Sequence, residues 1–165
     1  MSKVQILVGM IASGKSSYCK KAAKEGILCV NDDAIVNMLH AGNYTEYKSK
    51  LKPLYKSIEN HIVGCALMLG KTIIIDRGVN ISRRARARFI NIAKSFDAKV
   101  EAIIFPKESP EIHAKRRFEK DSHGISYERW LNCAKAHNTA WVNPTLLEGF
   151  DAIHYTDFNS DNVIL

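Results

Sequence analysis

The sequence predicts an α/β fold in which helices cover both faces of a parallel sheet. Short apolar runs alternate with segments of helical periodicity, and strands that are separated by helices pair in parallel. No linker, repeat or low-complexity tract divides the 165 residues, so the whole chain is expected to form one domain. Strands are expected at residues 4–8, 27–30, 72–75, 100–105 and 152–155.

Helices are expected between these strands, and serine residues mark several of their first turns. Ser82, Ser109 and Ser126 each precede a helical segment and can accept hydrogen bonds from its first free N–H groups. In the longest helix apolar residues recur every three or four positions until Gly70 ends it. The expected helices span residues 15–25, 33–39 and 52–69, and three more run from Ser82 to about Phe96, from Ser109 to a break at residues 121–124, and from Ser126 to about Ala136.

A complete phosphate-binding loop follows the first apolar run, because residues 9–16 read GMIASGKS and match G-x-x-x-x-G-K-[ST]. Its glycines let backbone N–H groups turn inward around phosphate oxygens. The Lys15 ammonium is expected to reach the β- and γ-phosphates, and the Ser16 hydroxyl to bind Mg²⁺. The expected ATP contacts are Gly9, Ala12, Ser13, Gly14, Lys15, Ser16 and Ser17. The loop makes this a P-loop NTPase fold, a three-layer sandwich.

Carboxylates follow two of the expected strands, at the edge of the sheet where ligands bind. Asp32 and Asp33 come after the second strand, and either can accept a hydroxyl proton when it faces the phosphate loop. One of the two is expected to cap the next helix, which leaves the other free. Asp76 ends a run of three isoleucines and is expected to hold Mg²⁺ through water or to pair with a basic side chain. The alternative for Asp76 is to cap the loop backbone only.

Basic residues cluster in two segments, and the net charge of +7 indicates a polyanionic partner. Arg84 and Arg88 share one helical face, and Arg77 lies at the end of the third strand. Arg77 and Arg84 are expected to bind a phosphate backbone, whereas at least half of the arginines in this segment form a solvated face. Residues 115–120, KRRFEK, predict a helical lid that brings cations to the transferring phosphoryl group, with a charged surface helix as the alternative.

Beyond the phosphate loop, the chain resembles the 5′-hydroxyl polynucleotide kinases over most of its length. These include the kinase modules of the bacteriophage end-healing enzyme and of the eukaryotic DNA-repair kinase/phosphatase. Asn31-Asp32-Asp33 is similar to the family's N-x-D element, and Asp76 with residues 78–86 looks like its D-x-N segment and arginine-rich helix. Residues 144–150, PTLLEGF, resemble a P-T-x-x-E-G-F stretch of the eukaryotic repair enzyme.

The resemblance implies an adenylate-kinase-like fold with a lid and an activity that uses ATP and Mg²⁺. The enzyme would transfer the γ-phosphate to the 5′-OH end of DNA or RNA in nucleic-acid repair or end healing. Asp33 falls on the family's general base, and Arg116 and Lys120 fall on two lid positions that are usually arginine. Asp76, with Arg77 and Arg84, would then position the acceptor, while Arg117 would contact ATP or substitute for Lys120.

Three departures from the family pattern stand out. Val36 occupies the place of a phage-type arginine that contacts the acceptor's 3′-phosphate, so Arg77 or Arg84 is expected to take that role or the substrate differs. Lys120 offers a point charge instead of a bidentate guanidinium. The chain has no D-x-D-G-T element, so residues 1–165 are expected to be a kinase domain without a phosphatase.

Two other functions compete with this interpretation. One is a kinase for a small molecule such as a nucleoside, nucleotide, sugar or antibiotic, which Val36 favours; the other is a nucleotide-dependent switch that hydrolyses ATP onto water. Four scattered cysteines indicate reduced thiols, and the lack of a long apolar run favours a cytoplasmic protein. The resemblance to the phage enzyme adds a virus-encoded enzyme that acts in the host cytoplasm. The sequence leaves open the nature of the acceptor strand, ATP against GTP, the oligomeric state, and any separate phosphatase or ligase partner.

Overall fold

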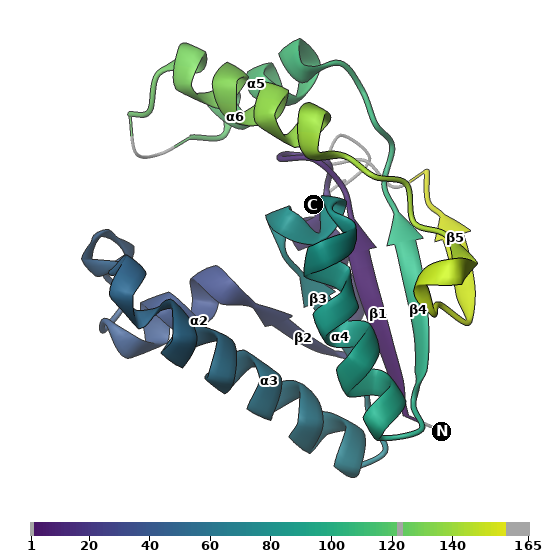
Figure 1. Cartoon of the computed structure of the whole chain (residues 1–165). Helices are drawn as coiled ribbons and strands as arrows, with labels where there is room; N and C mark the ends of the chain where they lie inside the picture. The colour runs from purple at the N-terminus through teal and green to yellow at the C-terminus, as the bar shows by residue number, and fades with distance from the viewer. Residues whose placement is uncertain (1, 122–123, 158–165) are drawn as a thin grey trace.

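A computed structural model describes residues 2–121 and 124–157, which form a five-stranded parallel sheet with helices packed around it (Figure 1). The strand order is β2-β3-β1-β4-β5, and each neighbouring pair is parallel. The strands are β1 (Lys3–Val8), β2 (Leu28–Asn31), β3 (Thr72–Asp76), β4 (Lys99–Ile104) and β5 (Ala152–Tyr155). The predicted fold class is confirmed, and each predicted strand agrees with the structure to within one residue at either end.

The helices also follow the sequence prediction, with shifts at their ends. Ser82, Ser109 and Ser126 are N-caps whose side chains accept hydrogen bonds from the first turns that follow. The last helix continues to Ala140, four residues beyond its expected end, and Ser122 and His123 of the expected break lie outside the described residues. The α-helices are α1 (Lys15–Lys24), α2 (Asp32–Leu39), α3 (Lys52–Met68), α4 (Arg83–Ser95), α5 (Pro110–Glu119) and α6 (Tyr127–Ala140). Short 3₁₀ turns are η1 (Tyr44–Glu46), η2 (Ser49–Leu51), η3 (Gly78–Ile81) and η4 (Leu146–Glu148).

The sheet is buried on both faces because its strands alternate between two apolar clusters. Val4 and Ile6 point into the larger cluster beneath α3 and α4, while Leu7 points into the smaller one beneath α1. The α5–α6 pair lies instead beyond the carboxyl ends of β1 and β4, over the loop that leaves β1 (Figure 1). Among the described residues, no helix is both long and apolar enough to cross a bilayer, and all four cysteines are free.

A buried ion pair fixes the segment before β5 to α4. The Arg86 guanidinium has no exposed surface and binds both carboxylate oxygens of Glu148, at 2.6 and 2.9 Å. It also donates to the backbone oxygens of Asn80 and Val142, each at 3.0 Å. Glu148 completes a capping box with Thr145 in η4. The PTLLEGF stretch and the arginine-rich helix are therefore joined through Arg86, which does not belong to the solvated face expected of that helix.

Replacing Arg86 with alanine is expected to lower the free energy of unfolding by about 3–5 kcal/mol, because it leaves the Glu148 carboxylate buried without a partner. Chemical denaturation followed by circular dichroism measures this change. Arg83→Ala, which removes an exposed arginine from the same helix, is the matched control and is expected to stay within about 0.5 kcal/mol of the wild type. Equal stability of the two variants would show that the buried pair does not hold this segment.

Candidate active site

The phosphate-binding loop turns from β1 into α1 through two residues in the left-handed region, Ala12 at φ 50° and Gly14 at φ 98°. The Lys15 ammonium lies within the curve of the loop and donates to the backbone oxygens of Gly9 at 2.8 Å and Met10 at 2.7 Å. Burial lowers the pKa of Lys15 to about 8, although the nearby Asp76 carboxylate acts in the opposite direction. In this structure the Lys15 ammonium is therefore bound to the backbone of its own loop.

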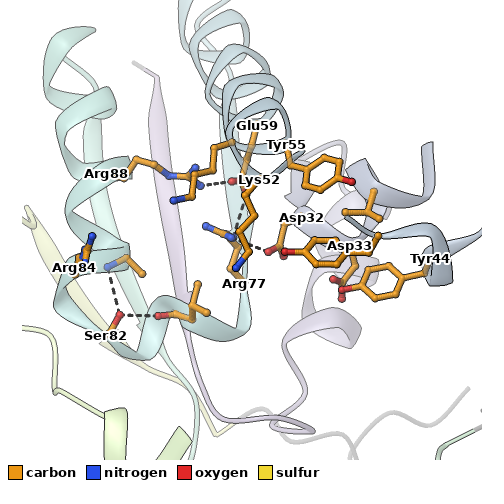
Figure 2. Close-up of a pocket in the computed structure, with 15 residues that line it drawn as sticks. Asp32, Asp33, Tyr44, Lys52, Tyr55, Glu59, Arg77, Ser82, Arg84 and Arg88 are labelled. Atoms are coloured by element: carbon orange, nitrogen blue, oxygen red, sulfur yellow. Dashed lines mark hydrogen bonds and ion pairs between the residues drawn. The ribbon is translucent and has the colours of Figure 1, made fainter. Parts of the chain in front are cut away.

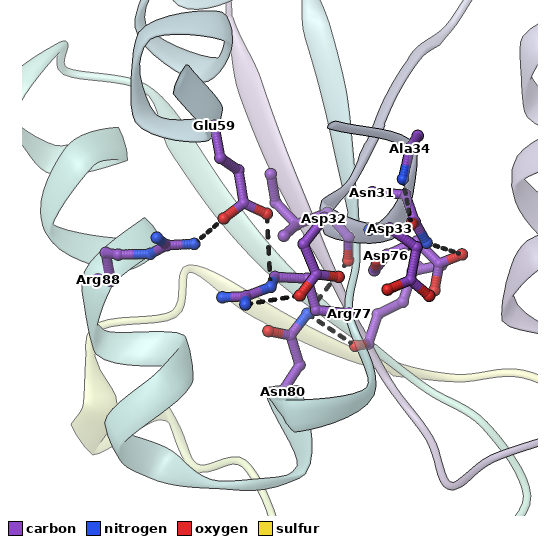
Figure 3. Close-up of polar contacts among 11 residues, drawn as sticks. Asn31, Asp32, Asp33, Ala34, Glu59, Asp76, Arg77, Asn80 and Arg88 are labelled. Atoms are coloured by element: carbon purple, nitrogen blue, oxygen red, sulfur yellow. Dashed lines mark hydrogen bonds and ion pairs between the residues drawn. The ribbon is translucent and has the colours of Figure 1, made fainter. Parts of the chain in front are cut away.

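A second group of polar side chains joins this loop to the ends of β2 and β3. The Ser16 hydroxyl donates to Asp76 Oδ2 at 3.0 Å. Asn31 Nδ2 donates to the backbone oxygen of Asp76 at 3.1 Å (Figure 3). Asn31 Oδ1 accepts the backbone N–H groups of Asp33, at 2.8 Å, and Ala34, at 3.2 Å, so Asn31 caps α2. The expectation that an aspartate is this cap is wrong, because the Asn31 side chain already occupies the position.

The Ser16 hydroxyl and the Asp76 carboxylate form an oxygen donor set that fits Mg²⁺ beside the phosphate loop. No group of three or more histidine, cysteine or acidic side chains in the described part of the chain is placed to hold a metal by itself. A cation at Ser16 would therefore depend on phosphate oxygens and water for its remaining ligands. Ser17 follows in the first turn of α1, half-buried next to this group.

A cavity of about 470 Å³ lies between α2, α3 and α4, beyond the carboxyl ends of β2 and β3 (Figure 2). Five basic side chains and three carboxylates line it, which gives it a net charge of +2. The charged residues are Lys52, Lys56, Arg77, Arg84, Arg88, Asp32, Asp33 and Glu59. The expected acceptor residues Asp33, Arg77 and Arg84 thus come together in one cavity, whereas Asp76 is not among its lining residues and lies against Ser16.

Glu59 holds two of the basic side chains of the cavity in place. It lies on the buried face of α3 with 1% of its side chain exposed, 3.4 Å from Arg77 and in direct contact with Arg88 (Figure 3). Burial raises the pKa of Glu59, and the two guanidinium groups oppose that rise. Arg77 also donates to Asp32 at 2.7 Å. Arg77 is thus neutralised by two carboxylates and carries little charge toward a ligand.

Sequence reasoning missed Glu59, although the sequence contains a signal for it. Glu59 lies four residues after Tyr55 and four before Val63, both of which are buried, so the helical period places a carboxylate on an apolar face. A charge in that position needs a cationic partner from another element. Tyr44, Lys52 and Lys56 were also missed, because no local motif marks them.

The surroundings of Asp33 raise the pKa of its carboxyl group. Burial raises its pKa, and the neighbouring Asp32 charge raises it further. The Tyr44 hydroxyl, which hydrogen-bonds to this carboxylate, and the Arg117 charge both oppose the rise. Asp32 instead forms an ion pair with Arg77, so the two adjacent aspartates have different surroundings.

The α5–α6 pair carries the expected lid cations above the phosphate loop. The Arg117 guanidinium stacks on the Trp130 ring, 4.6 Å from its centroid, and is close enough to affect the Asp33 carboxyl. Arg116 is half-buried and Lys120 is the exposed C-cap of α5. His137 of α6 accepts the backbone N–H of Ile11 through Nδ1 at 3.3 Å, which ties this helix pair to the loop.

Comparison with known proteins places this geometry in a family. A family described as an AAA domain matches residues 4–135. The chain belongs to this AAA domain family. Its fold is that of the P-loop kinases, and no curated protein matches the sequence.

Three solved structures illustrate the range of P-loop kinases that share this fold. A Chloroflexus aurantiacus protein, assigned provisionally as a kinase, is 15% identical with a TM-score of 0.73 and coverage of 99% of this chain and 89% of that one. A chain of the Pnkp1/Rnl/Hen1 RNA repair complex is 19% identical with a TM-score of 0.65 over 86% of this chain and 46% of that one. Mycobacterium tuberculosis APS kinase CysC, bound to AMPPNP and APS, is 15% identical with a TM-score of 0.52 over 96% and 90%. These similarities establish the fold, and this chain spans less than half of the RNA-repair chain.

Replacing Gly9 with alanine is expected to lower the affinity for AMPPNP at least tenfold, because the new Cβ would lie 2.3 Å from Ser13 Oγ and 3.0 Å from Phe105 Cβ. Isothermal titration calorimetry measures the affinity. Gly64→Ala is the matched control, since a Cβ there meets only the Phe96 ring at 3.4 Å. Unchanged affinity in the Gly9 variant would show that the loop accommodates the methyl group without losing its phosphate-binding shape.

Proposed function

We propose that residues 1–165 form an ATP-dependent polynucleotide 5′-hydroxyl kinase domain that acts on nucleic-acid ends during repair or end healing. The observation that carries the proposal is the position of Asp33. Its carboxylate, with a raised pKa, lines a cavity of net positive charge and is close enough to Asp76, the partner of Ser16 in the phosphate loop, to be affected by its charge. A proton acceptor in a basic cavity is what the phosphorylation of a hydroxyl on a polyanion requires.

The donor half of the site would bind the triphosphate of ATP. The N–H groups of the loop from Gly9 to Gly14 surround the phosphate oxygens, and Lys15 moves from the backbone oxygens of its own loop to the β- and γ-phosphates. Ser16 and Asp76 form the side of the loop where Mg²⁺ fits, and Ser17 would contact ATP. When bound there, Mg²⁺ neutralises charge on the β- and γ-phosphates.

Asp33 would act as the general base of the transfer. The 5′ oxygen of the acceptor forms a bond to the γ-phosphorus as its proton passes to a carboxylate oxygen of Asp33. The bond from the γ-phosphorus to the β–γ bridging oxygen breaks, and ADP leaves with that electron pair. Arg116, Arg117 and Lys120 would approach from the α5–α6 pair and stabilise the charge on the transferring group.

Arg84 and Arg77 would serve the acceptor in different ways. Arg84 is exposed at the cavity and has no ion pair among the described residues, so it is available to a phosphate. Arg77 is held between Asp32 and Glu59 and would position those two carboxylates instead. The Pnkp1-containing RNA repair complex lends this acceptor class further support, as does the overall basic charge.

A kinase for a small molecule is the second candidate, and Val36 is the observation that favours it. Val36 puts an apolar surface where phage-type enzymes have an arginine, and APS kinase shows a small acceptor on the same fold. The salt dependence of KM separates the two, because a polynucleotide site weakens steeply with salt and a small-acceptor site weakens only mildly. ATP turnover without any acceptor would favour a hydrolytic switch over both kinases. We also propose that the enzyme is cytoplasmic, which includes a virus-encoded enzyme in a host.

The Asp33→Asn variant is expected to lower the transfer rate by roughly 10²–10⁴, because the amide cannot accept the proton of the attacking hydroxyl. The measurement follows label from γ-labelled ATP, with Mg²⁺, to a 5′-OH oligonucleotide and to its first nucleotide bearing a 3′-phosphate. The matched control is Asp97→Asn, an exposed aspartate at φ 49° that asparagine tolerates.

Each outcome of this assay has a distinct meaning. Full transfer activity in the Asp33 variant would remove Asp33 from its role while leaving the kinase activity intact. Failure of the wild type to label either nucleic-acid acceptor, with ATP consumed when small metabolites are added, would replace the proposed function with the small-molecule kinase.

The pH dependence of kcat/KM is expected to show an acid limb above the ordinary aspartate pKa of about 3.9, because burial and Asp32 raise the pKa of Asp33. Activity is lost as the pH falls through that raised pKa, since the protonated carboxyl cannot act as a base. Asp32→Asn removes a negative neighbour and should move the limb to lower pH, whereas Tyr44→Phe removes a hydrogen bond to the carboxylate and should move it to higher pH. Shifts in the same direction would contradict this assignment of the limb to Asp33.

A further inference from the structure

Three tyrosines next to Asp33 form a stack along one side of the cavity. The Tyr44 and Tyr47 rings lie 6.2 Å apart between centroids at 15°, and the Tyr47 and Tyr55 rings 5.6 Å apart at 30°. Tyr44 keeps 46% of its surface exposed and Tyr47 keeps 36%, whereas Tyr55 is buried. All three line the cavity, and Tyr44 reaches Asp33 (Figure 2). Two exposed aromatic rings therefore border the site of the proposed reaction.

The inner end of this tyrosine stack is anchored. The Tyr55 hydroxyl is 2.9 Å from His40 Nε2 and accepts the backbone N–H of Lys48 at 3.4 Å. Each tyrosine has only two rotatable side-chain bonds, so a stack that is fixed at one end loses little entropy when a flat ligand lies on it. An anchored and partly exposed stack has the properties of a platform for a nucleic-acid base.

Cations without ion pairs lie elsewhere on the same cavity. Within the part of the chain that the structure describes, Lys52, Lys56 and Arg84 line the cavity and have no ion pair, whereas Arg77 and Arg88 are neutralised by carboxylates. Lys52 and Lys56 come from one turn of α3, and Arg84 comes from the first turn of α4, on the other side of Arg77 from the tyrosines (Figure 2). Arg84 thus faces the tyrosine stack across the cavity, whereas Lys52 and Lys56 lie on α3, the helix that also carries Tyr55.

We infer that the acceptor is a single-stranded nucleic-acid end whose terminal base lies on the Tyr44–Tyr47 stack and whose next phosphate binds Arg84, Lys52 and Lys56. This inference rests on the proposed function, because it gives the 5′ oxygen to Asp33. Tyr44 touches Asp33, so the sugar of the terminal nucleotide spans the distance from the reacting oxygen to the base platform. The phosphate on the 3′ side of that sugar then points away from the stack toward the unpaired cations.

Val36 fits this arrangement as an apolar part of the cavity wall. It is 3% exposed and faces the cavity from α2, where a sugar or base is a better neighbour than a phosphate. The phosphate is accordingly expected on the α3 and α4 side. A cavity of about 470 Å³ is at the smaller end of the common range for bound small groups, about 300–1,000 Å³, and accommodates one nucleotide better than a base pair. A duplex end would need to open before its terminal nucleotide enters.

The test of stacking compares Tyr44→Leu with Tyr44→Phe, because both lose the hydroxyl beside Asp33 and only the leucine variant loses the ring. With a 5′-OH single strand, KM for the leucine variant is expected to be roughly tenfold above that for the phenylalanine variant. With a strand whose 5′-terminal nucleotide is abasic, the two KM values should agree. A ratio that is the same for both strands, or near one for the intact strand, would overturn base stacking.

The test of the phosphate contact uses Arg84→Ala, with Arg83→Ala on the same helix as the matched control, since Arg83 is exposed but does not line the cavity. The slope of log KM against log salt is expected to fall by roughly 0.7 in the Arg84 variant, the loss of one single-strand phosphate contact, and to stay unchanged in the Arg83 variant. Equal slopes in the wild type and the Arg84 variant would contradict the assignment.

A comparison of single-stranded and duplex acceptors distinguishes failure of the proposed function from failure of this further inference. A single strand is expected to have a lower KM than a blunt duplex of the same sequence, and equal values would overturn the single-strand inference. If the wild type labels no 5′-OH oligonucleotide of any kind, the proposed function itself fails. If it labels single strands while the tyrosine and Arg84 variants behave like the wild type, only this further inference fails.

Discussion

The hydrogen bonds to Asp76 determine how the donor and acceptor halves of this molecule meet. Asp76 ends β3, accepts a hydrogen bond from Ser16 of the phosphate loop, and receives Asn31 from the end of β2. Because β2, β3 and β1 are parallel neighbours, their carboxyl ends lie at one edge, and these side chains need no further device to come together. Asn31 then caps α2 and sets the direction in which that helix presents Asp33 to the cavity. The sheet order and one asparagine thus bring the phosphate loop and the cavity carboxylate together.

Charge compensation explains why so basic a cavity is stable and why its arginines are not equivalent. Glu59, buried on α3, is shared between Arg77 and Arg88, and Asp32 takes the second side of Arg77. Removing Glu59 would leave the partly buried Arg88 guanidinium without a carboxylate and Arg77 with Asp32 alone, which costs more than the loss of an exposed pair. The paired arginines are therefore part of the wall, and ligand charge is left to Arg84, Lys52 and Lys56.

Local patterns in the sequence predicted most of the fold, because each element carries its own signal. Short apolar runs marked the strands, and serine caps and the phosphate loop were recognised from a few adjacent residues. What the sequence did not predict depends on competition between neighbouring residues for one position, or on contacts between residues far apart in the chain. An aspartate was expected to cap α2, but the preceding Asn31 fills that role. No local pattern singled out Arg86 among the arginines of its helix, because its partner Glu148 lies sixty-two residues away. Tyr44 and Lys52 reach the cavity only through the fold of the segment between α2 and α3, which has no motif.

The chemical class of the proposed acceptor is inferred from the cavity side chains that have no ion pair among the described residues. After Arg77 and Arg88 are matched with Asp32 and Glu59, the cavity retains three cations, one carboxylate and two exposed tyrosine rings. A nucleotide at the end of a strand uses all of these features, since it joins a hydroxyl, a flat base and a phosphate through one sugar. In the proposed complex, Val36 would be the apolar surface between those groups, and its departure from the phage-type pattern would correspond to a different position of the bound phosphate.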